Sequence, residues 1–147
     1  FGGDLCGKTI AIWGLAFKPG TDDMREAPSI DLIEALLEDG AKVRAYDPVA
    51  QETARAALPQ LAQQRGELAF SEDAYSAAAG ADALVLVTEW PEFREPDFAQ
   101  LRRKMRHLLI IDGRNQYHPE TLSRLGFHYI GVGRGQKNAP VATAIAS

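Results

Sequence analysis

Short apolar runs alternate along this chain with segments whose apolar residues recur at helical spacing, and this alternation limits the possible folds more than any other feature. The run at 83–88 (ALVLVT) is the most continuous, as expected for a strand covered on both faces. Strand and helix alternate five or six times, which predicts an α/β, doubly wound, mainly parallel sheet of five to six strands with helices on both faces. The predicted strands are 8–13, 42–46, 68–70, 83–88, 108–111 and 128–132, and the predicted helices are 28–39, 50–58, 71–79, 97–105 and a short one after Pro119.

Local signals place the ends of several predicted helices in this Rossmann-like arrangement. Pro28 suits a first helical turn, where its missing N–H has no intrahelical acceptor to lose, and Gly40 suits a helix end. Ser71 is a candidate N-cap, and the stretch between Leu58 and Gly66 is interpreted as a polar connector.

Composition excludes several classes of protein. A length of 147 residues suits one domain, and a net charge of −4 argues against nucleic acid as a partner. The basic cluster Arg102, Arg103, Lys104 and Arg106 is interpreted as a solvated helix face. The single cysteine, Cys6, rules out an internal disulfide and fits a cytoplasmic location.

The chain has no apolar run of about 18 residues, so no membrane segment is predicted. It carries no signal-peptide pattern and no initiator Met, from which we expect a piece of a longer protein.

Ligands of such sheets bind at the carboxyl ends of the strands, which directs attention to the loop 14–28. A dinucleotide fingerprint G-x-G-x-x-G is absent, because Ala16 and Pro19 stand at the second and third glycine positions. Lys18 and Arg25 instead bring two cations close to a helix N-terminus, which favours a phosphate or pyrophosphate ligand.

Each of these loop residues also has a structural interpretation. Lys18 could be a solvated lysine that pairs with Asp22 or Asp23, and these two acids are interpreted as turn residues rather than metal ligands.

Two later loops contribute further candidates. Trp90 and Phe93 could flank a ligand or close the sheet edge, the second interpretation being favoured. Arg114 follows a predicted strand end and can reach a ligand, the alternative being an ion pair with Asp112 or Asp22.

The run GLAFKPGTDDMREAPS at 14–29 resembles the signature of the UDP-glucose/GDP-mannose dehydrogenase family, where it opens the C-terminal domain. The segments TEWPEF (88–93), DGRN (112–115) and YIGVGR (129–134) match in the same order, so that the resemblance spans about residues 5–134. Among family members, the motifs are most similar to those of UDP-glucose 6-dehydrogenases.

The resemblance implies a role for each part of the chain. Residues 1–7 would be a linker from upstream domains, 8–134 the UDP-sugar-binding domain and 135–147 a flexible tail. Phe17, Lys18 and Arg114 would contact the nucleotide sugar, and Arg25 would reach NAD across a domain interface. The full-length enzyme would be an NAD-dependent homodimer, with no metal.

Family members oxidise a sugar alcohol to a carboxylate through a thiohemiacetal on a cysteine. That cysteine belongs to a motif upstream of this domain, and no Phe-Pro follows Cys6. Cys6 is therefore expected to be non-catalytic, and this piece alone inactive.

Three alternatives remain open at this point. The chain could come from a UDP-N-acetylmannosamine or GDP-mannose dehydrogenase. It could be a stand-alone NAD-binding domain in which Asp47 binds the ribose, although Asp47 follows Gly14 by 33 residues rather than about 20. It could also be a non-enzymatic binding module that shares only the fold.

Overall fold

The computed structural model describes residues 4–25 and 27–131. The strands are β1 (Thr9–Trp13), β2 (Lys42–Tyr46), β3 (Leu68–Phe70), β4 (Ala83–Leu86), β5 (Leu109–Asp112) and β6 (His128–Gly131). The helices are α1 (Pro28–Glu38), α2 (Gln51–Ala57), α3 (Gln60–Gln64), α4 (Ala74–Ala78), α5 (Phe98–Lys104) and α6 (Pro119–Arg124), with a 3-10 turn η1 (Pro91–Phe93).

The strands form one six-stranded sheet in the order β3-β2-β1-β4-β5-β6, and every neighbouring pair is parallel. β1 therefore pairs with both β2 and β4, and the strand order reverses between β1 and β4. This reversal is the topological switch point at which doubly wound sheets bind ligands.

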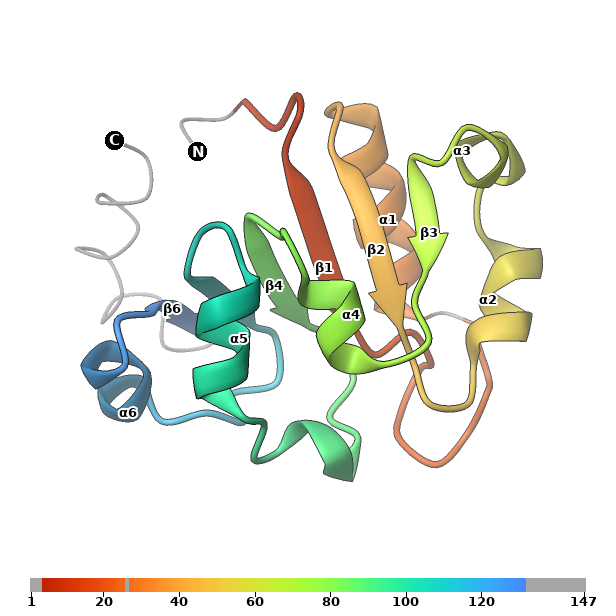
Figure 1. Cartoon of the computed structure of the whole chain (residues 1–147). Coiled ribbons are helices and arrows are strands. Elements are labelled where there is room, and N and C mark those ends of the chain that lie inside the picture. The colour runs from red at the N-terminus through yellow and green to blue at the C-terminus, as the bar shows by residue number, and fades with distance from the viewer. Residues whose placement is uncertain (1–3, 26, 132–147) are drawn as a thin grey trace.

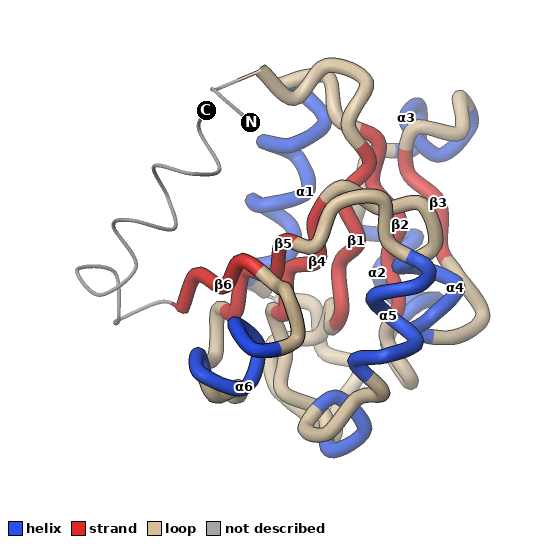
Figure 2. Tube along the Cα trace, turned by 60° about the vertical axis from the view of Figure 1, so that its left-hand side comes forward, coloured by secondary structure: helices blue, strands red, loops and turns tan. Residues whose placement is uncertain are grey.

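Helices cover both faces of the sheet, as the sequence predicts. α4 packs on β1 and β2 and contacts α5, whereas α1 packs on β2 from the other side (Figures 1 and 2). The indole N–H of Trp13 donates to the carbonyl of Ala74 at 2.9 Å, which ties β1 to α4. All four residues of β4 are buried, because the strand lies at the centre of the sheet with both faces covered.

Two local predictions are wrong. The connector after Leu58 contains a helix, α3, which lacks an apolar stripe because Leu61 is exposed and only Ala62 is buried. Helix α4 begins later than predicted, and its N-cap is Asp73 rather than Ser71; the Asp73 carboxylate accepts from the amide of Ser76 at 2.8 Å.

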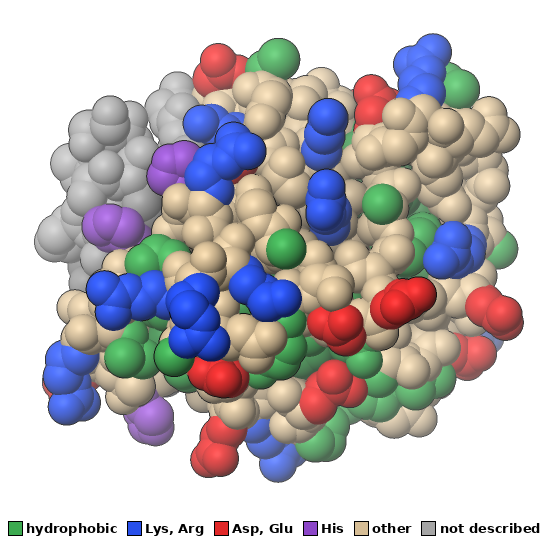
Figure 3. Space-filling view, in the orientation of Figure 1, with side chains coloured by type: hydrophobic (Ala, Val, Ile, Leu, Met, Phe, Trp, Pro, Cys, Tyr) green, Lys and Arg blue, Asp and Glu red, His purple; other side chains and the backbone are tan. Residues whose placement is uncertain are grey.

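Three members of the basic cluster lie on an exposed helix face as predicted, whereas Arg106 follows α5 and its Nε atom lies 3.9 Å from the carboxylate of Asp82. Arg102, Arg103 and Lys104 are exposed on α5, whereas Leu101 and Met105 turn inward. Lys and Arg side chains gather over α5 on the face drawn in Figure 3. This helix presents a solvated face to water and an apolar face to the core.

Asp82, at the amino-terminal end of β4, is a buried carboxylate whose ionisation supports the fold. Burial alone would raise its pKa, but hydrogen bonds from the Thr9 amide and the His107 ring, together with the charge of Arg106, hold the pKa below its ordinary value. A depressed pKa stabilises the folded state above the unfolded pKa of about 3.9, and this stability is lost as the pH falls through the folded value.

We therefore expect Asp82→Asn to lower the free energy of unfolding at pH 7. The difference in free energy of unfolding between the variant and the parent should become smaller below about pH 4. Urea unfolding at several pH values measures this. A difference that stays constant from pH 7 to pH 3 would contradict the role of the charge.

Parts of the predicted domain boundaries lie outside the described residues. Residues 4–7 form a turn before β1, while 1–3, 132–134 and the predicted tail 135–147 are not described. Within the described ranges, no helix has the length and apolar composition that a membrane span requires.

Candidate functional site

The loop after β1 is fixed to the rest of the sheet by the carboxylate of Asp47, which follows β2. One oxygen accepts from the amides of Leu15 (2.7 Å) and Ala16 (3.1 Å), and the other accepts from the amides that follow Asp47 itself, at 49 and 50. The indole N–H of Trp90, in the loop after β4, also donates to the first of these oxygens, Oδ2, at 3.0 Å. One buried carboxylate thus binds three loops together at the switch point.

The loops after β1 and β4 also approach each other directly. Gly14 has φ of +94°, and a Cβ placed on it would lie 2.5 Å from the backbone nitrogen of Thr88. The hydroxyl of buried Thr88 donates to the carbonyl of Ala16 at 2.7 Å. Glycine is therefore required at position 14 both for its backbone angle and for its lack of a side chain.

Trp90 and Phe93 belong to the core, which supports the favoured interpretation that they close the sheet edge. Phe93 is fully buried and stacks on Trp13 with ring centroids 4.9 Å apart. The indole N–H of Trp90 is already hydrogen-bonded to Asp47. Their role is to hold the loop after β4 in place.

Phe17 and Lys18 come directly after this anchored segment and are both exposed. Phe17 is 49% exposed, so part of its ring is accessible to a ligand. Its amide donates to the carbonyl of Asp23 at 2.8 Å, which closes the loop behind it. The structure thus presents an aromatic ring and an ammonium group from a rigid backbone.

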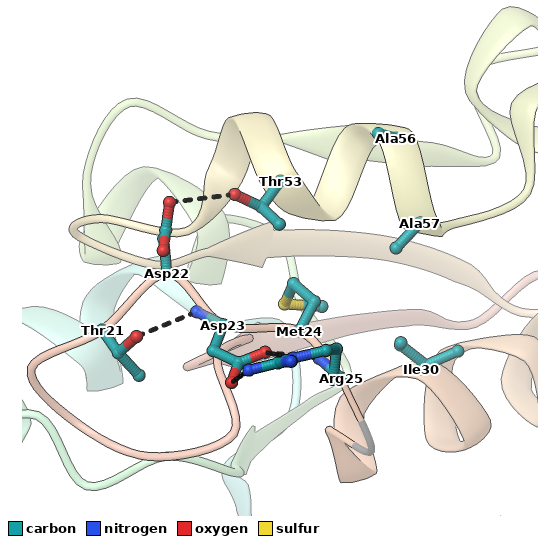
Figure 4. Close-up of a pocket in the computed structure, with 9 residues that line it drawn as sticks. All are labelled: Thr21, Asp22, Asp23, Met24, Arg25, Ile30, Thr53, Ala56 and Ala57. Atoms are coloured by element: carbon teal, nitrogen blue, oxygen red, sulfur yellow. Dashed lines mark hydrogen bonds and ion pairs between the residues drawn. The ribbon is translucent and has the colours of Figure 1, made fainter.

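Arg25 lies further along the same loop and pairs with Asp23. Its Nε and Nη2 atoms contact the two carboxylate oxygens at 3.1 and 3.0 Å, and its side chain is 89% exposed. Hydrogen bonds from Arg25 lower the pKa of Asp23, and the charge of Lys18 contributes. Figure 4 shows this pair at an open pocket of about 790 Å³ between the loop and α2, where Asp22 accepts from Thr53.

The loop after β5 is fixed by a second buried carboxylate, Asp112. It accepts from the amides of Arg114 (3.0 Å) and Tyr117 (2.8 Å) and from the hydroxyl of Tyr129 (2.8 Å). Asn115, which directly follows Arg114, has a left-handed φ of 56°. This geometry fixes the direction in which the Arg114 side chain leaves the backbone.

The partner of Arg114 is Glu89, so the predicted alternative of an ion pair with Asp112 or Asp22 is wrong. Glu89 lies in the loop after β4, and both its oxygens contact the guanidinium, one of them at 3.1 Å from Nη2. The pairing raises the pKa of Arg114; burial opposes ionisation of Glu89, but the hydrogen bond holds its pKa below the ordinary value.

The site therefore combines three exposed cations on loops with buried anchors. Lys18 and Arg25 share the loop after β1, and Arg114 lies two strands away, on the loop after β5. Cations at the carboxyl edge of a parallel sheet suit an anionic ligand such as a phosphate. No group of three His, Cys, Asp or Glu side chains among the described residues could hold a metal ion.

Comparison with known proteins gives consistent matches. Residues 11–119 match the model of the UDP-glucose/GDP-mannose dehydrogenase family, UDP binding domain. A UDP-glucose 6-dehydrogenase of Pseudomonas aeruginosa is 54% identical over 134 residues, which are 91% of this chain and 29% of that protein.

Solved structures of similar fold agree. A UDP-glucose dehydrogenase from Pyrobaculum islandicum is 32% identical with a TM-score of 0.69, over 88% of this chain and 26% of that one. A UDP-D-ManNAc dehydrogenase from Pyrococcus horikoshii is also 32% identical with a TM-score of 0.69, over 90% of this chain and 27% of that one. The chain thus spans less than a third of the length of each protein named here.

Proposed function

Because the chain belongs to the UDP-glucose/GDP-mannose dehydrogenase family, we propose that it binds the UDP portion of a nucleotide sugar at the carboxyl edge of its sheet. The observation that carries this proposal is the arrangement of Lys18 and Arg114 on loops fixed by buried carboxylates. Loop backbones that are already anchored lose little further conformational freedom when a diphosphate binds, so more of the attraction appears as affinity. Exposed Phe17 offers an apolar surface beside them.

The longer protein would be an NAD-dependent UDP-glucose 6-dehydrogenase. Such an enzyme oxidises the sugar's primary alcohol to a carboxylate by two hydride transfers to two NAD molecules, and water supplies the second carboxylate oxygen when it releases the product from the cysteine. Binding of the remote UDP would position the reacting hydroxymethyl group against the cofactor. Residues 8–134 would supply the UDP site, and the catalytic cysteine and most NAD contacts would come from other parts of the protein.

Arg25 is the residue of this chain that we assign to NAD. NAD supplies the hydride acceptor when bound, and its pyrophosphate is an anion that a guanidinium fits. Arg25 is almost fully exposed, and its pair with Asp23 leaves the Nη1 end available. An arginine at this place can cross a domain interface, where the homodimeric enzyme would close over its ligands.

The competing NAD-binding interpretation has a specific difficulty. A ribose-binding acid must offer a carboxylate oxygen to the ligand, but both oxygens of Asp47 already accept from the chain's own donors. UDP is therefore favoured over NAD as the main ligand of this domain. A UDP-N-acetylmannosamine dehydrogenase remains the second candidate, since one such enzyme is as similar in structure as the UDP-glucose enzyme.

We expect Lys18→Ala and Arg114→Ala, made in the longer protein, each to weaken UDP binding about 10- to 100-fold, because each removes a charge-assisted hydrogen bond. Calorimetric titration with UDP measures this. Lys42→Ala and Arg65→Ala are matched controls, because both residues are exposed cations at the opposite edge of the sheet. Lys42 is the first residue of β2, and Arg65 lies in the segment just before β3. Unchanged affinity in both test variants would overturn the proposal.

A further inference from the structure

Arg114 is held side-on by Glu89, a residue of the loop after β4. The Nε and Nη2 atoms of the guanidinium contact the two carboxylate oxygens. The Arg114 side chain is 47% exposed and that of Glu89 only 23%, so Arg114 is the more accessible member of the pair.

Both backbones of this pair are fixed independently. Glu89 stands between Thr88, whose hydroxyl is bound to the carbonyl of Ala16, and Trp90, whose indole is bound to Asp47. On the other side, the Arg114 amide is bound to Asp112, and a Cβ at Gly113 would lie 2.9 Å from the carbonyl oxygen of Leu86. At Gly113 the loop after β5 therefore lies against the end of β4 with no side chain between them. The Arg114–Glu89 pair connects two loops whose backbones are each held by hydrogen bonds.

The pairing leaves part of the guanidinium available. Arginine carries five N–H donors in a planar fork, and Glu89 engages the Nε–H and one N–H of Nη2. The Nη1 end and the second N–H of Nη2 remain for another acceptor. A planar group held on one edge presents the opposite edge in a fixed direction, which suits bidentate binding of a phosphate.

Resting on the proposed function, we propose that Glu89 is a positioning residue that orients the guanidinium of Arg114 toward the diphosphate of the nucleotide sugar. Without Glu89, the long Arg114 side chain samples several rotamers and must be ordered when the ligand binds. Glu89 also places a negative charge near the anion, and this repulsion acts against the gain from orientation. Salt screens this repulsion more than it weakens the Arg114–Glu89 contact, because the repulsion acts across the width of the guanidinium whereas the paired atoms are about 3 Å apart.

The test is a double-mutant cycle in the longer protein, with UDP affinity measured at about 0.5 M salt, where the Debye length is only about 4 Å. We expect Glu89→Ala to weaken UDP binding about three- to tenfold. The same substitution made in an Arg114→Ala background should change the affinity less than about 1.5-fold, because the residue through which Glu89 acts is gone. Uridine, which lacks phosphate, should bind equally well to the parent and to Glu89→Ala.

Two further variants sharpen the test. Glu92→Ala removes a charge from the same loop without touching Arg114, since Glu92 accepts from Tyr46, and it should leave UDP affinity unchanged. Glu89→Gln keeps one oxygen for the guanidinium and should lie between the parent and Glu89→Ala. Equal thermal melting of these variants would show that the fold is intact.

Each outcome supports or overturns the inference. Unchanged or tighter UDP binding by Glu89→Ala, with Arg114→Ala still impaired, would overturn the positioning role while leaving the proposed function in place. An equal loss in the Arg114→Ala background would also overturn it, since Glu89 would then act on the fold. If Arg114→Ala itself binds UDP normally, the assignment of Arg114 fails and the role of Glu89 fails with it.

Discussion

Asp47→Ala is expected to lower the free energy of unfolding by about 3–5 kcal/mol. The carboxylate is 2% exposed and accepts five hydrogen bonds from two parts of the chain and from the indole of Trp90. Alanine would leave these donors without an acceptor in a buried place, where each unpaired group costs about 1–3 kcal/mol. Local rearrangement and entering water keep the total below the simple sum.

Urea unfolding, followed by circular dichroism, measures this loss. The matched control is Asp39→Ala, which removes an exposed carboxylate at the end of α1 and should change stability by less than about 0.5 kcal/mol. A loss below about 1 kcal/mol for Asp47→Ala would mean that the loops at the switch point hold together without the carboxylate.

Gly14→Ala is expected to lower the free energy of unfolding by roughly 2–5 kcal/mol, for two separable reasons. A left-handed φ costs a residue with a side chain roughly 1–2 kcal/mol. Overlap of the new Cβ with Thr88, 2.5 Å from its backbone nitrogen, adds roughly 1–3 kcal/mol because backbone cannot move aside easily.

Gly20 in the same loop separates these reasons. Its φ is +86°, close to the +94° of Gly14, but a Cβ there would meet nothing within 4 Å. Gly20→Ala should therefore show only the backbone part of the loss, and the difference between the two variants measures the steric part. Equal losses in urea unfolding would show that the contact with Thr88 does not limit position 14.

The fold could be predicted from the sequence because each strand has a strong local signal. The apolar run at 83–88 is continuous, as expected for a strand covered on both faces, and it contains β4 (Ala83–Leu86). Helix α3 gave no such signal, since Leu61 points to solvent and a single alanine is buried. Helix α3 lies where the chain turns back toward β3. The periodicity of apolar residues does not predict a helix of this kind.

The exposed cations of the site could also be predicted, but not the acids that hold them. Arg114 and Glu89 are 25 residues apart, and neither motif alone indicates that they meet. The signal lies in the register of β4 against β5, where Leu86 is opposite Asp112, so that the positions just after each strand are neighbours. Sequence reasoning considered Asp47 only as a ligand for ribose, because hydrogen bonds to the backbone of distant loops leave no mark on composition or spacing.

The Asp47 carboxylate also affects how the site moves. Leu15 and Ala16 can leave their positions only if a buried carboxylate loses its hydrogen bonds, so opening of this loop requires opening of the core. The backbone of the site should therefore fluctuate with the cooperativity of the whole sheet rather than as an independent lid. Fast adjustment to a ligand is left to side chains beyond the anchored segment, such as Phe17 and Lys18, which can change rotamer on the nanosecond timescale.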